Sequence, residues 1–404
     1  MENIYIILNI LQLLVFIYLG LATFYLFVFA LASLFKHKLP KQQNRDNLKY
    51  AVLIPGYKED QVIIDVAKES LKQNYPSELY DIIIIADSFK KETLAELNKL
   101  NVNIIEVSFE RSTKSKSLNQ ALNLLPENVY DVAIVLDADN IMEKDFIKKI
   151  NALFIPEIRV IQGHRIAKNT NTSFAILDAI SEEMNNNIFR KGHRNLGFSS
   201  ALIGSAMAFR YSYFKTMMED INAVGGFDKQ LELKIIKNRD KIEYHMEAFV
   251  LDEKIQNSQA FSNQRKRWIS AQLYYFRKDF LISFWHFLSK GNLDYFNKAY
   301  QFIQPPRVLL LGLLFVITFA SLLLNPFLYS LFWGGILLMC ILSFFFTVPI
   351  RFYNIQTFKA FLSLPIGFCL MFITFFGFNK KKHQKSFIHT EHTATTKENT
   401  INKE

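Results

Sequence analysis

The chain contains little cysteine: two residues among 404, Cys340 and Cys369. Both lie inside apolar stretches, so they provide neither a disulfide framework nor the spaced thiolates of a zinc site. The sequence also has no internal repeat, and low-complexity sequence is confined to the Thr- and Lys-rich part from His389 onward. These absences exclude a disulfide-stabilised scaffold, a structural zinc site and a repeat architecture.

Charge is absent from three long runs, residues 3–35, 308–350 and 360–379. Because a bilayer-spanning helix needs roughly 20 apolar residues, the first run predicts one span and the second predicts two, broken at Asn325-Pro326. The third run is just long enough for one more. A transporter or channel is expected to carry charged residues within its spans. None of the three runs contains one, so this class of protein is disfavoured.

The first run could instead be a secretory signal peptide. The apolar core of such a peptide is only ~7–15 residues long and follows a basic start. Here Glu2 stands in place of the basic start, and no small-residue cleavage pattern precedes Lys36. We therefore expect residues 1–35 to be a retained transmembrane helix.

Basic residues exceed acidic ones, and the formal net charge is +10. Much of the excess flanks the apolar runs, in a predicted cytosolic linker, residues 36–49, and a polar tail, residues 380–404. This distribution follows the positive-inside rule, which explains the charge better than nucleic-acid binding does.

The rule does not hold at both ends if the chain crosses the membrane four times. With the linker inside, two spans in the second run return the chain to the inner side near Arg351. A further crossing would then place Lys380–Lys385 outside. Either the last run re-enters without crossing or the charge rule fails there, and the 20-residue length of the run favours four crossings.

Residues 50–255 alternate between short apolar segments and amphipathic ones. The predicted strands are Ala51–Pro55, Asp81–Ala86, Val102–Val107 and Val132–Leu136, and the predicted helices are Gln61–Leu71, Lys91–Leu100 and Ser115–Leu125. Strands that are apolar on both faces and alternate with helices predict an α/β domain with a mostly parallel sheet.

Polar clusters follow the predicted strands, where ligands of such sheets bind. They are Tyr57–Asp60, Asp87-Ser88 and Asp137-Ala138-Asp139. Strand alternation directs Asp137 and Asp139 to one face, where two carboxylates can hold Mg²⁺ or Mn²⁺. Such a cation would offset the charge of a nucleotide diphosphate leaving group. The alternative is a solvated turn with a helix cap.

Residues 256–303 predict amphipathic helices at the membrane surface, followed by a C-terminal transmembrane region, residues 304–379, of two or three spans. Gln264, Arg267 and Trp268 are spaced i, i+3 and i+4 and therefore share one helix face. Trp268 can stack on a sugar ring and Arg267 can pair with a diphosphate. The same residues also suit a helix that lies in the headgroup layer between Phe261 and Leu281, and both interpretations can hold.

Residues 50–270 resemble membrane-integrated family 2 glycosyltransferases, the group of cellulose, chitin, hyaluronan and poly-N-acetylglucosamine synthases. The matching motifs occur in the order of that family: Pro55-Gly56-Tyr57-Lys58-Glu59, Asp87, Lys116 ahead of Leu118–Leu122, Asp137-Ala138-Asp139, Asp228, and Gln264 with Arg267-Trp268. The resemblance implies a GT-A-like fold. It also supports the interpretation of Asp137 and Asp139 as ligands of a divalent metal ion.

The resemblance also implies roles for individual residues. Tyr57 would pack on a uracil ring, Glu59 would reach the ribose, and Asp87 would hold the base or sugar part of the nucleotide. Lys116 would meet the diphosphate, with Lys114 as its rival for that role and solvation as the ordinary alternative.

The general base is where this chain departs from the family. The family pattern has a Glu before the Asp, whereas this chain has Phe227 before Asp228. Asp228 and Glu232 are both candidates. We favour Asp228, because it follows two glycines and suits a loop close to a ligand, whereas Glu232 lies in a predicted helix, Leu231–Ile236.

The implied activity is inverting transfer of a sugar, from a UDP-sugar in particular, to a membrane-held glycan or lipid, with processive polysaccharide synthesis favoured over single transfer to a lipid carrier. The enzyme would lie in the cell membrane with several spans and a cytosolic catalytic domain. The altered base region leaves a catalytically inactive scaffold as the alternative. Gly204-Ser205 could line the acceptor path, and Asp252-Glu253-Lys254 could place the neighbouring helix.

Overall fold

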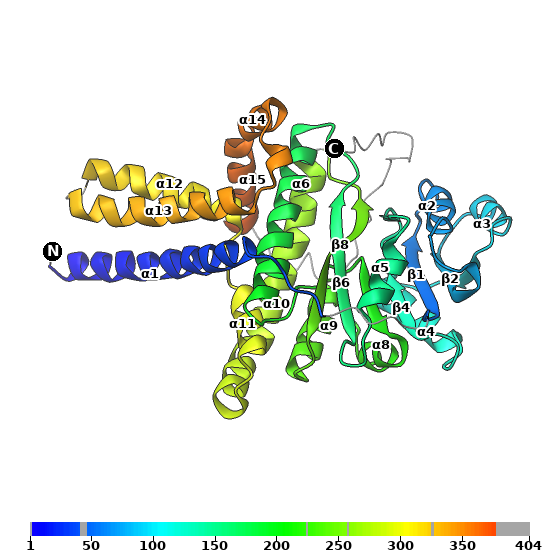
Figure 1. Ribbon diagram of the computed structural model, residues 1–404. Helices are drawn as coiled ribbons and strands as arrows, with labels where there is room; N and C mark the ends of the chain where they lie inside the picture. The colour runs from blue at the N-terminus through cyan, green and yellow to red at the C-terminus, as the bar shows by residue number, and fades with distance from the viewer. Residues whose placement is uncertain (1, 41–46, 224, 257, 325–326, 377–404) are drawn as a thin grey trace.

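A computed structural model describes residues 2–40, 47–223, 225–256, 258–324 and 327–376. These residues form an α/β domain from which a group of long apolar helices extends to one side (Figure 1). The predicted α/β class is confirmed. The predicted polar tail, residues 380–404, lies outside the described residues.

The first half of the domain has the predicted alternation of strands and helices. Its elements are β1 (Tyr50–Tyr57), α2 (Ile63–Ser70), β2 (Tyr80–Asp87), α3 (Lys91–Leu97), β3 (Asn103–Val107), α4 (Lys114–Leu124) and β4 (Val132–Val135). Strands β3, β2, β1 and β4 are neighbours in this order, and all three pairs are parallel. Tyr57 pairs with Asp87, so β1 and β2 end together at one edge of the sheet.

The second half makes the sheet mixed. Its elements are β5 (Ile141–Met142), α5 (Phe146–Leu153), β6 (Val160–Ala167), α6 (Ser173–Asn185), α7 (His193–Asn195), β7 (Met207–Arg210), α8 (Tyr211–Met218), α9 (Phe227–Lys237) and β8 (Ile242–Asp252). Strand β7 is antiparallel to both β4 and β6, and β8 is parallel to β6. The parallel arrangement predicted for the first four strands therefore does not extend across the sheet.

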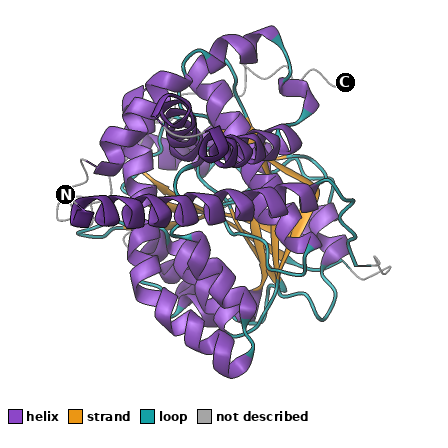
Figure 2. Ribbon diagram, turned by 90° about the vertical axis from the view of Figure 1, so that its left-hand side faces the viewer, coloured by secondary structure: helices purple, strands orange, loops and turns teal. Residues whose placement is uncertain are grey.

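Two apolar clusters cover the two faces of the sheet. Val52 and Ile54 of β1 pack on one face with residues of α2 and α5, and Ala51 and Leu53 pack on the other with residues of α4, α8 and α9. Figure 2 shows the strands enclosed by helices. Because both faces are covered, these strands are apolar throughout rather than alternating, which is the pattern read from the sequence.

Within the described residues, three helices have the length and composition to cross a membrane: α1 (Glu2–Ser33), α12 (Arg307–Leu324) and α13 (Phe327–Thr347). They lie side by side in Figure 1 and share a buried cluster that includes Leu26, Leu310 and Trp333. The second apolar run thus contains two helices, as predicted. The break itself, Asn325-Pro326, lies outside the described residues.

The third apolar run contributes α15 (Leu364–Phe376), which follows the short α14 (Ile355–Phe361). Its 13 residues rise about 20 Å, well short of the ~30 Å of a bilayer core. Helix α15 packs on α12 and on α10 (Ser258–Lys290). The fourth crossing that the length of this run favours is therefore not found within the described part of the chain.

The predicted interfacial segment is a helical hairpin of α10 and α11 (Leu293–Gln301). In Figure 1 it runs across the ends of α1, α12 and α13, between them and the sheet, and α6 lies in the same layer. A π-helical segment, Asn186–Gly192, continues α6 and packs against α1. Gly192 is required there, because a Cβ would lie 2.2 Å from the carbonyl oxygen of Phe29.

Candidate active site

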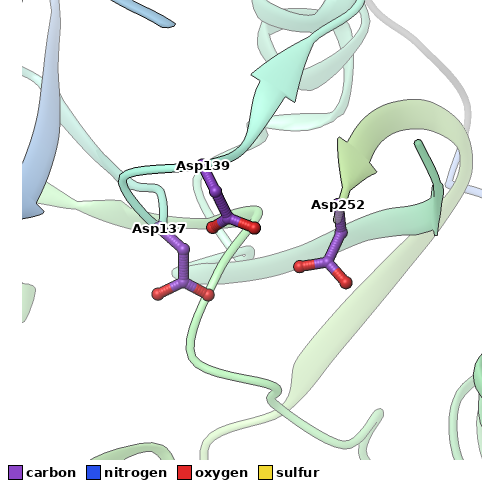
Figure 3. Close-up of side chains that lie close together, drawn as sticks. All are labelled: Asp137, Asp139 and Asp252. Atoms are coloured by element: carbon purple, nitrogen blue, oxygen red, sulfur yellow. The ribbon is translucent and has the colours of Figure 1, made fainter. Parts of the chain in front are cut away.

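Three carboxylates meet at the carboxyl end of β4. Asp137 and Asp139 follow this strand, and Asp252 is the last residue of β8. Oxygens from the three side chains lie within 4.8 Å of one another, and Figure 3 shows the side chains directed into a common space. We call them the acidic triad. The sequence placed Asp137 and Asp139 together, but Asp252 was assigned only to the placement of a neighbouring helix.

Two neutral side chains hold the triad in place. The amide nitrogen of Asn140 donates to Oδ1 of Asp139, at 3.1 Å, and to Oδ1 of Asp252, at 3.0 Å. Ser205 accepts a hydrogen bond from the backbone nitrogen of Asp137, at 2.9 Å, and its hydroxyl donates to Asn140. Ser205 therefore supports the triad, a role that its position in the sequence did not indicate.

Buried cations balance part of the triad's charge. Arg165, on β6, lies 3.7 Å from Asp137, 3.2 Å from Asp252 and 3.0 Å from Glu182. Lys254 lies 2.7 Å from Asp252. Burial favours the neutral form of Glu182, but Arg165, Lys254 and then Arg190 outweigh it and hold the pKa of Glu182 well below its ordinary value.

Three carboxylates without a sulfur or imidazole ligand fit a hard divalent cation such as Mg²⁺ or Mn²⁺. Asn140 orients two of the three carboxylates, as supporting groups around a metal site do. The predicted pair Asp137 and Asp139 thus belongs to a set of donors suited to such an ion.

The ends of β1 and β2 form a second part of the site. Tyr57 ends β1 half-buried, and Glu59 follows two residues later. Asp87 ends β2 with 1% of its surface exposed. Its Oδ1 accepts from the hydroxyl of Ser88, at 3.0 Å, whereas its buried Oδ2 has no hydrogen-bond partner among the described residues. Such an atom is costly unless a ligand supplies a donor.

The residue after each of these strands has a left-handed backbone, with φ of 57° at Lys58 and 59° at Ser88. This conformation is strained for side chains other than glycine, and such residues concentrate at binding and catalytic sites. The two strands therefore turn sharply where Tyr57 and Asp87 are presented.

Of the two candidate lysines, the structure places Lys114 at the triad. Its Nζ donates to Oδ1 of Asp137 and, at 2.7 Å, to the carbonyl oxygen of Gly204. Lys116 is exposed, and its Nζ donates to the carbonyl oxygen of Arg111 at 2.9 Å. The two lysines are two positions apart on a helix, so they cannot face the same way.

Asp228 lies in the first turn of α9, so the expectation that it belongs to a loop is wrong. Its side chain borders Gly204, where an added Cβ would lie 3.8 Å from the Cβ of Asp228. Glu232, one turn later, is buried and pairs with Lys298 of α11 at 2.6 Å. Burial raises the pKa of Glu232 to about 6, although Lys298 opposes this. Asp228 thus lies beside Gly204, whose carbonyl oxygen accepts from Lys114, whereas Glu232 faces α11.

Gln264, Arg267 and Trp268 lie on α10, as predicted. One contact of this segment with α6 comes from the intervening Arg265, which bonds to Asp178 at 2.8 Å and lies 4.5 Å from the centre of the Trp268 ring. Asp178 is one turn before Glu182, the partner of Arg165. Helix α6 therefore links the Gln-x-x-Arg-Trp segment to the acidic triad.

Residues 47–271, more than half of the chain, match the family described as glycosyltransferase like family 2. The chain belongs to this glycosyltransferase family. Among curated relatives, a probable glycosyltransferase YdaM of Bacillus subtilis is 26% identical over 66% of this chain and 66% of its own length. A beta-monoglucosyldiacylglycerol synthase of Nostoc is 25% identical over 54% of this chain and 47% of its own length. The chain thus matches about half to two-thirds of these relatives.

Solved structures of similar glycosyltransferases include a mannosyltransferase of Pyrobaculum calidifontis in complex with GDP-Man and Mn²⁺. It is 12% identical, with a TM-score of 0.47, over 87% of this chain and 99% of that one. Residues 1–349 of Staphylococcus aureus TarS in complex with UDP-GlcNAc are 14% identical, with a TM-score of 0.41, over 80% of this chain and 92% of that one.

Proposed function

We propose that this glycosyltransferase moves a sugar, with inversion, from a UDP-type nucleotide sugar to a hydroxyl held at the membrane. The observation that carries the proposal is the acidic triad, which lies at the carboxyl edge of the sheet together with Oδ2 of Asp87, an oxygen that no residue in the described part of the chain hydrogen-bonds. Ligands of α/β sheets bind at this edge.

The donor site is assigned as follows. Tyr57 stacks on the base, Glu59 reaches the ribose, and Oδ2 of Asp87 accepts a hydrogen bond from the base or sugar part of the nucleotide. Lys114, rather than Lys116, meets the diphosphate, because its Nζ lies at Asp137. A lysine ammonium suits this task as a point charge.

Asp137, Asp139 and Asp252 would hold Mg²⁺ or Mn²⁺, which offsets the negative charge that develops on the diphosphate leaving group. The acceptor hydroxyl oxygen bonds to the anomeric carbon on the face opposite the diphosphate. The bond between that carbon and the phosphate oxygen breaks, and its electron pair leaves with the nucleotide diphosphate. Asp228 takes the acceptor proton.

The acceptor is assigned to the membrane because of the helices beside the site. Outward side chains of the three long helices are apolar and exposed, such as Phe315 at 63% and Leu324 at 81%. The α10–α11 hairpin also exposes Leu281, Trp285 and Leu288. A bilayer would cover both surfaces, with the three helices as spans in the cell membrane, the hairpin in the headgroup layer and the catalytic domain in the cytosol. The acceptor would then be a glycan or a lipid, the latter as in the name of the Nostoc relative.

The test is turnover of a panel of UDP- and GDP-sugars by the purified full-length enzyme, read as released nucleotide in the presence of Mn²⁺. Asp139→Asn and Asp252→Asn should lower turnover of the active donor by at least about 10²-fold, since each removes a ligand charge. Asp65→Asn, a half-exposed residue of α2, is the matched control. Unchanged turnover in Asp139→Asn would falsify the proposal.

The length of the product separates the two acceptor classes. A long glycan made by purified enzyme from labelled donor supports processive synthesis, which the resemblance to polysaccharide synthases favours. A single labelled sugar on an extracted lipid supports transfer to a lipid carrier.

A further inference from the structure

Both carboxylate oxygens of Asp137 face a cation. Oδ1 accepts a hydrogen bond from Nζ of Lys114, and Oδ2 lies 3.7 Å from Nη1 of Arg165. A divalent cation that binds Asp137 must therefore either share this carboxylate with Lys114 and Arg165 or displace one of them.

The two cations differ in how firmly they are held. Arg165 is 8% exposed, and it also contacts Asp252 and Glu182, which are buried as well. Lys114 is the first residue of α4, its side chain is 20% exposed, and its other hydrogen bond is to the backbone carbonyl of Gly204. A lysine side chain carries a compact ammonium on a flexible four-carbon stem. Lys114 is therefore the cation that can move away from Asp137.

We infer that Lys114 competes with the divalent cation for Asp137, and that it couples metal binding to binding of the nucleotide diphosphate. This inference rests on the proposed function. The metal displaces the Lys114 ammonium from Asp137, and the two phosphates of the nucleotide give that ammonium a new partner. Each ligand thus removes part of the cost of binding the other.

Coupling of this kind is reciprocal, because the factor by which UDP tightens Mn²⁺ binding must equal the factor by which Mn²⁺ tightens UDP binding. Part of the factor comes from direct contact between metal and phosphate and persists without the lysine. The part that depends on Lys114 disappears when its charge is removed.

The experiment measures Mn²⁺ binding by electron paramagnetic resonance, with and without UDP, on the full-length protein in detergent. Lys114→Met should bind Mn²⁺ alone about tenfold more tightly than the wild type, since an ion pair of this type opposes the metal. It should bind UDP more weakly. The factor by which UDP raises its Mn²⁺ affinity should be about tenfold smaller than in the wild type. Lys91→Met is the matched control, because it removes the charge of the exposed first residue of α3. It should bind Mn²⁺ and UDP as the wild type does.

Weaker Mn²⁺ binding by Lys114→Met alone, or an unchanged enhancement by UDP, overturns the inference while the metal site stands. Lack of Mn²⁺ binding by the wild type, with or without UDP, overturns the proposed metal site and the inference with it. A circular dichroism spectrum and a thermal unfolding curve that match the wild type establish that Lys114→Met is folded.

Discussion

At the scale of single residues, the decisive difference from the family pattern is Phe227. Its ring lies 5.4 Å from Nζ of Lys114 and borders Gly204, so it occupies the active-site side of α9. The residue that precedes the candidate base is therefore a neutral ring rather than a carboxylate. The structure nevertheless places Asp228 beside Gly204, whose carbonyl oxygen accepts a hydrogen bond from Lys114, and it buries Glu232 against Lys298.

This arrangement predicts different kinetics for the two candidate bases. Asp228→Asn should lower kcat by about 10²–10⁴-fold, because the acceptor proton loses its base, while the KM of the donor changes little. Glu232→Gln should keep most of its kcat per molecule of folded enzyme. Steady-state kinetics with the folded fraction measured in parallel decide between them. A larger loss of kcat in Glu232→Gln would reverse the assignment.

At the scale of elements, charged pairs join helices α6 and α9 to the α10–α11 hairpin. Glu232 joins α9 to Lys298 of α11, and Arg265 joins α10 to Asp178 of α6. Glu232 and Lys298 are each less than 10% exposed. Removing one member of a buried pair leaves an uncompensated charge, whereas removing both does not.

A double-mutant cycle on this pair follows from that asymmetry. Glu232→Leu and Lys298→Met should each reduce the free energy of unfolding by about 3–5 kcal/mol, and the double variant should be much closer to the wild type. Chemical unfolding in detergent, followed by fluorescence, measures the four proteins. Strictly additive losses would mean that the two side chains do not interact.

At the scale of the whole molecule, a topology in which the three long helices are the spans would agree with the charge distribution. If α1, α12 and α13 are the spans, the chain returns after α13 to the side of the catalytic domain. The basic residues Lys380–Lys385 then lie on the same side as the linker, in accordance with the positive-inside rule. If α15 is not counted as a crossing, the conflict found in the sequence does not arise.

A C-terminal tag tests this topology. In sealed vesicles whose cytosolic side faces inward, a protease should leave the tag intact, and it should cleave it only after detergent is added. A tag inserted between α12 and α13 should be cleaved in both conditions and serves as the control. Cleavage of the C-terminal tag in sealed vesicles would restore the four-crossing topology.

The local elements could be predicted because their signals are local. Strands β1 to β4 are apolar runs that end at polar clusters, and their predicted bounds agree with the observed ones to within a few residues. Asp252 could not be predicted in the same way, because its role depends on β8 pairing beside β6. The only sequence signal was its position after an apolar run, the same position that Asp137 occupies after β4.

The sequence by itself determined the long apolar helices, the α/β class and the family motifs, because uninterrupted apolar length, strand periodicity and motif order are properties of contiguous residues. Only the tertiary structure decided which residues meet at the site. In the structure Lys114, rather than Lys116, contacts Asp137; Asp252 lies with Asp137 and Asp139; and Glu232 pairs with Lys298. Each of these depends on contacts between segments 20 to more than 100 residues apart, which the packing of the sheet and helices alone brings together.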